Sequence, residues 1–464
     1  MDSALFSVSH AFHPTAIDVF GDVAFSNSVR RCQPDTGDSD GNDLFDLHLK
    51  VASLFSVAYA GVRFLPTCQE NIEADMEGLG FWMNLLEAKV DLETPWGLAK
   101  ATVDKIYDFL LENDGWNADG RLDRDFNLIP FSDLNAEDAE GNSWEPYTPC
   151  NSPWKLKRKH RWQPLVETDG VGYISHQQHV TPYIGATARL FGFESKKKEQ
   201  EFISRRSPYP NYKYHSASKE VLQEAAMMAT DDEKKVGIEF FDHKFTSLIP
   251  LKIEWAKSRQ TELEYYQVTL AVQLAMYDAT VLVWREKVCH DRVRPPTMIK
   301  SRFGDEEVYS YAGPGEGAKM IKASEWQPYV RTMPHSEYPS ASSCFCQVFA
   351  EVLQHSSGED DISPPLQFTA ATKGSLRSEP GITPATDVVF TYKKWSEIAE
   401  MCGQSRLWGG MHFEESVPAG AELCGGGLVA SEVLAAVDKL VAGNPDGAVF
   451  RKDEVDFFVR PDVC

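Results

Sequence analysis

Three short motifs constrain this fold more than any other feature of the sequence. The first places Lys287 and Arg294 seven residues apart. The second is a serine run that begins at Ser340, and the third places Arg406 six residues before His412. If a fold brings them together, three cations can neutralise up to three negative charges, hydroxyl and backbone N–H groups add neutral donors, and the histidine remains free to bind a central atom. The motifs therefore predict a pocket for an oxyanion such as phosphate or vanadate.

Each motif has a simpler interpretation when it is taken alone. Lys287 and Arg294 could form a solvated basic helix end, with Asp291 pairing with Lys287 one turn away. A serine such as Ser340 is a common helix N-cap, although a helix N-terminus also attracts anions. A histidine near an arginine is more often structural. The occurrence of all three motifs in this order favours the functional interpretation.

The composition of the 464 residues excludes several classes of protein. A net charge of -23 argues against a nucleic-acid binder or a binder of anionic membranes. No run approaches 18 uninterrupted apolar residues, so we expect a soluble chain without a membrane span. No secretory signal is visible at the N-terminus, which leaves secreted and cytoplasmic locations open, and a homo-oligomer is compatible with the sequence. The nine cysteines show no disulfide-scaffold or zinc pattern, and we interpret Cys344 and Cys346 as buried thiols.

Hydrophobic spacing predicts a mainly α protein, a multi-helix bundle with long connecting loops and few short strands. Helical spacing occurs in residues 44–64, 76–90, 97–112, 217–229, 232–250, 261–292, 341–356, 394–404 and 418–442. Short strands are expected near residues 307–311 and 386–391. The helix from residue 261 should end near Val293, because Pro295 and Pro296 disfavour helical geometry before them.

Composition along the chain predicts four parts. They are an N-terminal extension and loop (1–43), a helical and loop-rich part (44–216), a C-terminal helical bundle that carries the oxyanion site (217–445) and a tail (446–464). Residues 113–165 lack periodicity and predict a long ordered loop region. Within it, residues 114–120 resemble a calcium loop but fail its ligand spacing, so we expect no calcium site.

At its motifs the chain resembles the vanadium-dependent haloperoxidases, in particular their bacterial-type branch, within the superfamily shared with type 2 phosphatidic acid phosphatases. The family patterns K-x6-R-P, P-S-G-H or P-S-G-S, and S-R-x3-G-x-H correspond to residues 287–295, 339–342 and 405–412. Further similar segments lie at residues 161–165, 239–248, 313–317, 379–385 and 408–413. This resemblance implies α-helical bundles around one oxyanion pocket.

The resemblance also implies a vanadate cofactor, whose site phosphate fits in its absence. In such a site His412 bonds to vanadium through Nε2. The other ligands donate hydrogen bonds or charge to the oxygens: Lys287, Arg294, Ser340, the amide of Ala341, and Arg406. With hydrogen peroxide and a halide, such a site produces a hypohalite-level agent that halogenates a small organic acceptor.

Three positions depart from the family pattern. Ser342 stands where many members carry an acid–base histidine, and Ala341 replaces a glycine while keeping the amide. Ser416 stands where an acidic residue often orients the vanadium-bound histidine, a role that Glu414 or Glu415 could take instead. Because a hydroxyl cannot hold a proton as a cation, catalysis by Ser342 needs a further basic group. The candidates are His335, His290 and Lys244.

Two positions bear on the choice of halide. His335 occupies a place where the resemblance implies histidine in algal bromoperoxidases and phenylalanine in chloroperoxidase. At a second position, Trp284 is the residue that the resemblance implies in chloroperoxidase. Since iodide and bromide are easier to oxidise than chloride, we expect those two to be the substrates.

Other functions remain open for the same pocket. A phosphatase would use His412 as a phosphohistidine nucleophile, although Ser342 stands where such enzymes usually need a second histidine. A relative without redox chemistry could use the pocket for an acid–base rearrangement. An inactive homologue could simply bind an oxyanion.

Overall fold

The computed structural model describes residues 149–168, 175–177, 206–242, 244–256 and 262–441. It also describes residues 69–78, single residues or short runs between 52 and 104, and residues 190 and 192. The chain divides into two compact units, residues 1–130 with 260–264 and residues 131–259 with 265–464. All three oxyanion motifs belong to the second unit. The four-part division expected from the sequence stays a prediction.

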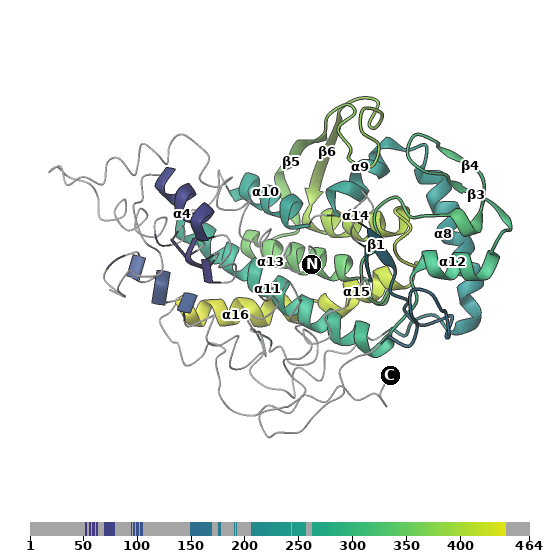
Figure 1. Ribbon diagram of the computed structural model, residues 1–464. Coiled ribbons are helices and arrows are strands. Elements are labelled where there is room, and N and C mark those ends of the chain that lie inside the picture. Colours follow the sequence, from purple (N-terminus) through teal and green to yellow (C-terminus); the bar gives the residue numbers. More distant parts are fainter. Residues whose placement is uncertain are drawn as a thin grey trace, which may run out of the picture. The chain divides into compact units, whose positions relative to one another are not determined.

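Helices account for most of the described residues, as Figure 1 shows. The α-helices are α4 (Gln69–Gly78), α8 (Tyr214–Met228), α9 (Asp232–Phe240), α10 (Lys244–Ala256), α11 (Glu262–His290), α12 (Pro295–Phe303), α13 (Ala341–Ser357), α14 (Trp395–Trp408), α15 (Ser416–Cys424) and α16 (Leu428–Val441). Short 3-10 turns are η4 (Asn211–Lys213) and η5 (Ala323–Glu325). The prediction of a mainly α fold is confirmed.

The described strands form antiparallel pairs. They are β1 (Val166–Thr168) with β2 (Ser175–Gln177), β3 (Glu307–Tyr311) with β4 (Ala318–Lys322), and β5 (Asp361–Ala371) with β6 (Val388–Lys394). The predicted strand at residues 307–311 is confirmed, and the one at 386–391 lies two to three residues further on. In the longest pair, Phe368 faces Phe390 across the ladder, and both side chains pack against Phe240 of α9. This hairpin therefore supports the helices beside it and does not form a separate layer.

Local sequence explains where the helices that carry the site begin and end. The Asp231 carboxylate accepts a hydrogen bond from the Lys234 amide and so caps α9. Ser340 caps α13 in the same way, and Gly358, with a φ of 81°, closes that helix in the left-handed conformation. Pro295 starts α12, because a proline fits the first helical turn, where its missing N–H is not needed.

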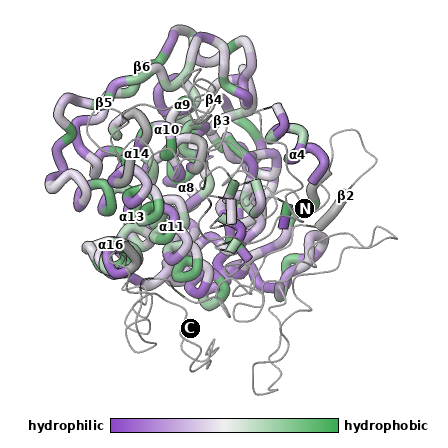
Figure 2. Tube along the Cα trace, turned by 90° about the vertical axis from the view of Figure 1, so that its left-hand side faces the viewer, coloured by the Kyte–Doolittle hydropathy of each residue, from purple (hydrophilic) through white to green (hydrophobic). Residues whose placement is uncertain are grey.

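Helix α13 lies at the centre of the second unit, between α11, α14 and α15 (Figure 1). Its buried residues belong to a large apolar cluster that also includes α10, α11, α14 and the β5–β6 hairpin. A second cluster joins α8, α12 and the β3–β4 hairpin to Met411 and Phe413. Hydrophobic and hydrophilic residues alternate in short stretches along these helices, as amphipathic packing requires (Figure 2). Because His412 lies between Met411 and Phe413, the third motif is fixed by the second cluster.

Two predicted helices are each divided in the structure. The segment predicted as one helix at residues 232–250 forms α9 and α10, with Phe241 and Asp242 between them. The segment at 418–442 forms α15 and α16, separated where Gly426 and Gly427 adopt positive φ values that favour glycine. Hydrophobic spacing continued through both breaks, so periodicity alone did not reveal them.

The helix predicted from residue 261 ends at His290, close to the expected Val293. Asp291, with a φ of 47°, turns the chain, and Pro295 then begins a helix that was not predicted. Helical residues occur within the predicted segments 44–64 and 97–112. Most of the predicted helix at 76–90, the loop at 33–43 and the calcium-like stretch at 114–120 lie outside the described residues.

One apolar stretch of the described residues passes a length and composition test for a membrane-crossing helix. It runs from Ser416 to Lys439 and so includes α15 and most of α16. Half of its most apolar 18-residue window is buried inside the protein, as in the core helix of a globular protein, and the stretch is weak evidence for a membrane span.

Candidate oxyanion site

Lys287 lies near the end of α11 and is almost wholly buried, with 1% of its surface exposed. Its ammonium donates hydrogen bonds to the carbonyls of Ser336, Glu337 and Pro339, at 2.9, 3.1 and 2.5 Å. All three N–H groups are therefore engaged, and they fix the segment that leads into Ser340. Burial, reinforced by nearby Arg294, lowers the pKa of Lys287 well below its ordinary value. Lys287 thus supports the pocket wall as well as contributing charge.

Arg294 lies immediately before α12 and directs its guanidinium toward the third motif. Its Nε donates to the carbonyl of His335 at 2.9 Å, and one terminal nitrogen donates to the carbonyl of Met411 at 3.0 Å. The same terminal nitrogen lies 3.4 Å from Nε2 of His412. Burial lowers the pKa of Arg294 to about 10, so the group remains cationic at neutral pH. Arg294 therefore places a positive charge at the atom expected to bind vanadium.

His412 follows α14 and is 4% exposed. Its Nδ1 lies 2.8 Å from Oε1 of Glu337, and the same oxygen accepts the Phe413 amide at 3.0 Å. A carboxylate at Nδ1 favours the tautomer that is protonated there, which leaves the lone pair on Nε2. Burial, followed by Arg294 and Lys287, lowers the pKa of His412 well below its ordinary value. The imidazole is thus neutral and able to ligate.

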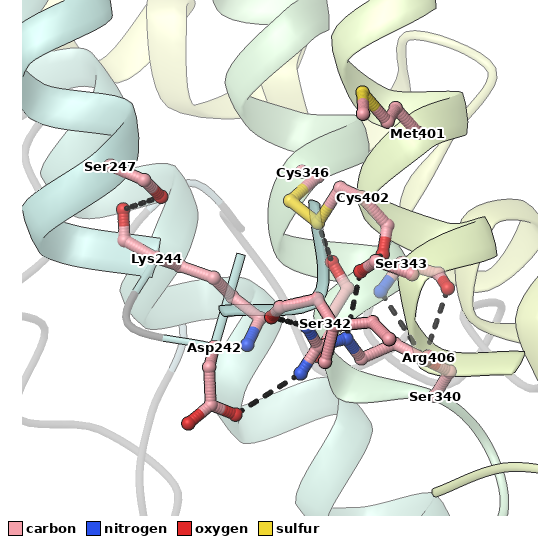
Figure 3. The surroundings of a disulfide bond; sticks show 12 residues. Asp242, Lys244, Ser247, Ser340, Ser342, Ser343, Cys346, Met401, Cys402 and Arg406 are labelled. Atoms are coloured by element: carbon pink, nitrogen blue, oxygen red, sulfur yellow. Dashed lines mark hydrogen bonds and ion pairs between the residues drawn. A yellow bond between two sulfur atoms is a disulfide. The ribbon is translucent and has the colours of Figure 1, made fainter. Parts of the chain in front are cut away.

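Arg406 belongs to α14 and is held from several sides. Its Nε donates to the Ser405 hydroxyl at 3.0 Å, and one terminal nitrogen donates to the carbonyl of Ile238 at 2.7 Å. The other terminal nitrogen reaches Asp242 Oδ1 at 3.2 Å (Figure 3). The same nitrogen lies 3.7 Å from the Met411 sulfur. Four of its five N–H groups are engaged within the described residues, so one N–H remains for an oxyanion.

The N-terminus of α13 supplies neutral donors. The Ser343 amide and hydroxyl lie 3.3 and 3.0 Å from Oγ of Ser340, so Ser340 accepts both and keeps its own O–H for another partner. The amides of Ala341 and Ser342 open the helix and have no intrahelical acceptor. A Cβ on Gly420 would lie 2.1 Å from the Ser340 carbonyl, so only glycine lets α15 approach this closely. The first turn of α13 is therefore available to an anion.

The prediction that Cys344 and Cys346 are thiols was wrong, although both are buried. Cys344 forms a disulfide with Cys424 of α15, and Cys346 forms one with Cys402 of α14. Residues two apart on a helix point about 200° away from each other, so the two cysteines meet different neighbours. The Cys346–Cys402 bond lies beside Ser342 and Arg406 (Figure 3). Both disulfides therefore connect helices that carry the site.

The candidates for proton transfer divide into two groups. His335 lies at the site, with Nδ1 2.9 Å from a terminal nitrogen of Arg294. Burial and Arg294 lower the pKa of His335 well below its ordinary value, so it is neutral. Lys244, the first residue of α10, extends toward Arg406 and Ser342 (Figure 3). Burial and then Arg406 lower the pKa of Lys244 to about 7.

The third candidate and the two expected orienting acids lie elsewhere. His290 pairs with Glu286 on its own helix at 3.1 Å. Glu415 pairs with Arg206 at 3.0 Å, and Glu414 is exposed. None of these residues contacts His412 among the described interactions, and the expectation that Glu414 or Glu415 orients it is wrong.

Glu337 is the residue of the candidate site that sequence reasoning missed. It lies three residues before Ser340 and is 1% exposed. Burial raises the pKa of Glu337, opposed by Ser416, Arg294 and Lys287. The sequence signal was present in the run from His335 to Ser340, but a lone glutamate beside a motif has no spacing that assigns it to a histidine 75 residues away.

We expect Glu337→Gln to weaken vanadate binding roughly 10- to 100-fold, as loss of a carboxylate behind a ligating histidine usually does. The amide keeps the shape but removes the charge that fixes the tautomer of His412. Titration calorimetry with orthovanadate measures the change. Glu286→Gln is the matched control, since it removes a carboxylate from the His290 pair outside the pocket. Equal losses in both variants would contradict the role of Glu337.

Comparisons with known proteins agree with this geometry. Residues 267–443 match a family model described as the VCPO second helical-bundle domain. The fold is similar to that of an apo-type bacterial vanadium-dependent chloroperoxidase, with 24% identity, 86% of this chain and 85% of that chain covered, and a TM-score of 0.71. A holo-type bacterial vanadium-dependent chloroperoxidase gives 23% identity, coverage of 94% and 92%, and a TM-score of 0.72. A bacterial vanadium-dependent iodoperoxidase gives 16% identity, with 93% of this chain and 95% of that chain covered, and a TM-score of 0.54. No curated protein matches the chain.

The chain therefore has the fold of the vanadium-dependent haloperoxidases, and residues 267–443 form a helical bundle of that type. The resemblance inferred from the motifs is confirmed at this level. The structure also brings Arg294 to both His412 and His335, and Arg406 to Met411, the residue before His412. Lys287 holds the backbone of Glu337, whose carboxylate contacts His412. The roles of these residues are part of the proposal that follows.

Proposed function

We propose that the protein is a vanadate-dependent haloperoxidase that oxidises bromide or iodide with hydrogen peroxide to a hypohalite-level agent. The observation that carries the proposal is the arrangement at His412. Its Nδ1 is occupied by Glu337, while its Nε2 faces Arg294 in a pocket with three buried cations. A neutral imidazole nitrogen beside concentrated positive charge is better explained as a ligand of a metal oxyanion than as part of a structural histidine.

The donor set fits vanadate. Arg406 retains one N–H and Ser340 retains its O–H, and no described residue accepts either of them. The first amides of α13 are further neutral donors for an anion. Three cationic side chains balance the charge of the oxyanion, and His412 supplies the bond to its central atom. Bound vanadate would supply Lewis-acid activation of peroxide toward halide. Phosphate fits the same charges and donors, though it needs no histidine ligand.

Trp284 and His335 support a halide position beside the pocket. Their ring centroids are 4.9 Å apart, and Nε1 of Trp284 is buried without a hydrogen-bond acceptor among the described residues. An unpaired N–H near His335, which itself contacts Arg294, would favour a bound anion such as bromide or iodide. A small organic acceptor would then meet the oxidant near this position.

The test is peroxide-dependent bromination and iodination of a dye, measured before and after reconstitution with orthovanadate. Vanadate-dependent turnover with either halide supports the proposal, and chloride run in parallel ranks the halides. Hydrolysis of a phosphate ester that vanadate inhibits, without halogenation, would make the protein a phosphatase. Neither activity would favour the rearrangement or binding functions.

We expect Lys244 to donate the proton that the peroxide reaction consumes, since Ser342 cannot hold one as a cation. Because the pKa of Lys244 is about 7, its protonated fraction falls as pH rises through neutrality, and turnover should fall with it. Lys244→Met should lower turnover roughly 100-fold at pH 6 and remove this decline. A pH profile of bromination measures both effects.

Lys252→Met is the matched control for this change. Lys252 lies on the same helix, and burial also lowers its pKa to about 7, but its ammonium donates to Thr269 at 2.5 Å. Its variant should keep the decline above neutral pH. A profile that is unchanged by Lys244→Met would contradict the assigned role.

A further inference from the structure

A basic loop, residues 152–161, lies on the surface of this acidic protein. Positions 155 to 161 hold five lysine and arginine residues, and no acidic residue occurs from position 146 to 166. Four of these cations are exposed and pair with no carboxylate of the described residues: Lys155, Lys157, Arg158 and Lys159. Unpaired like charges so close together repel one another. The basic loop therefore favours a partner that brings negative charge to it.

The conformation of the basic loop is fixed by Asn151, which is 3% exposed. Its side-chain oxygen accepts the amides of Lys157 and Arg158 at 2.8 and 2.9 Å. Its side-chain nitrogen donates to the carbonyls of Arg158, Arg161 and Trp162 at 2.9, 3.0 and 3.1 Å. All these bonds involve the backbone of the loop, so they leave the cationic side chains to the solvent. A loop that is already ordered loses little conformational entropy when it binds a partner.

The end of the basic loop is attached to the segment between α11 and α12. The Trp162 amide donates to the carbonyl of Asp291 at 3.1 Å, and the Val293 amide donates to the carbonyl of His160 at 3.2 Å. The loop is therefore a fixed part of the second unit, and its charges are presented at a constant place on that unit.

An exposed tryptophan lies next to these cations. Trp154 is 84% exposed and directly precedes Lys155. Backbone hydrogen bonds of 3.2 Å in both directions between Ser152 and Lys155 close the turn that carries it, and the Gln163 side chain donates to the Ser152 carbonyl at 2.9 Å. The flat apolar face of an indole can pack against the C–H face of a sugar ring, while neighbouring cations bind acidic groups.

We propose that the basic loop binds an acidic polysaccharide, a chain of sugar rings that carry sulfate or carboxylate groups. Trp154 packs on one sugar ring, and the four exposed cations bind the acidic groups around it. The proposal does not depend on what the oxyanion pocket does, because the described contacts of these side chains include no residue of the candidate oxyanion site.

Two observations favour a polysaccharide over other polyanions. The net charge of -23 repels an extended anionic surface such as a membrane or a nucleic-acid duplex, whereas a narrow sugar chain interacts mainly with charges within a screening length of about 10 Å. The disulfides Cys344–Cys424 and Cys346–Cys402 are typical of proteins from oxidising compartments such as the cell exterior. Acidic polysaccharides are found there, whereas nucleic acids are mainly intracellular.

The experiment is titration calorimetry of the full chain with three polymers that share one glucose backbone: dextran sulfate, carboxymethyl dextran and uncharged dextran. The acidic dextrans should bind and uncharged dextran should not. Binding should weaken as salt is added, because exposed charges are screened. The acidic dextran that binds more tightly identifies sulfate or carboxylate as the preferred group.

Two variants test the residues of the basic loop. Lys157→Ala combined with Lys159→Ala should weaken dextran sulfate binding roughly tenfold at low salt. Trp154→Ala should weaken it roughly fivefold. The matched control is Lys319→Ala combined with Lys322→Ala, which removes two exposed lysines from β4 and should leave binding unchanged. All these side chains are exposed, so the variants should unfold at the same denaturant concentration as the unaltered chain.

The contrary outcomes are distinct from one another. Failure of both acidic dextrans to bind, or binding that the double lysine substitution in the loop leaves unchanged, would overturn the proposal. An unchanged affinity in Trp154→Ala would overturn the assignment to a sugar, since charge alone does not distinguish polyanions. A single-stranded oligonucleotide that binds as tightly as dextran sulfate would assign the basic loop to nucleic acid instead. None of these results depends on the halogenation assay.

Discussion

Replacing His412 by alanine is expected to reduce vanadate-dependent bromination to background. The substitution removes the imidazole whose Nε2 is oriented by Glu337 and faces Arg294. The three cations remain, so the variant should still attract oxyanions. What disappears is the bond to the central atom, on which the proposed chemistry depends. Dye bromination at saturating vanadate measures the loss.

Binding measurements separate this loss from a general collapse of the pocket. The unaltered chain should bind vanadate more tightly than phosphate, because only vanadate gains a bond from His412 without a chemical step. His412→Ala should bring the two affinities together by weakening vanadate far more than phosphate. His355→Ala, at an exposed position on α13, should change neither. Equal weakening of both anions would show that His412 acts only through packing.

Replacing Arg294 by methionine is expected to lower turnover by roughly 10²- to 10³-fold, the usual effect of losing one donor to a developing charge. Arg294 contacts His335, Met411 and His412, so its loss removes charge and order together. Two buried carbonyls would also lose their donor. The free energy of unfolding should fall by about 2 kcal/mol, partly offset by relief of repulsion with Lys287.

Steady-state bromination and denaturant unfolding measure these two effects. Arg302→Met is the matched control, because Arg302 lies at the exposed end of the same helix and donates to His215. Its variant should keep full turnover. If Arg294→Met loses stability but not turnover, the charge of Arg294 has no part in the chemistry.

The sequence predicted most of the helices because they depend on local rules, and it predicted the convergence of the motifs through their joint occurrence and the family resemblance. Residues 341–356 follow the serine cap Ser340 and keep an apolar stripe, and α13 occupies that range almost unchanged. Fixed spacings such as that between Lys287 and Arg294 identify residues by type and distance along the chain. Such patterns need no knowledge of tertiary contacts.

The remaining features depend on contacts between distant segments, which one sequence does not reveal. Glu337 reaches His412 because the segment before α13 is held by Lys287, and nothing in the local pattern requires this. The partners of Cys344 and Cys346 depend on which helices surround α13. The division between α9 and α10 places Asp242 against Arg406, although hydrophobic spacing runs through it.

The paired disulfides of α13 make the pocket dependent on where the chain folds. Such bonds persist in oxidising compartments and are rare where glutathione keeps thiols reduced. Cys289 is disulfide-bonded as well. Protein produced in a reducing cytosol would have the same sequence, yet α13 would be held to α14 and α15 only by packing and hydrogen bonds. Samples from the two sources should therefore not be assumed to have the same affinity for an oxyanion.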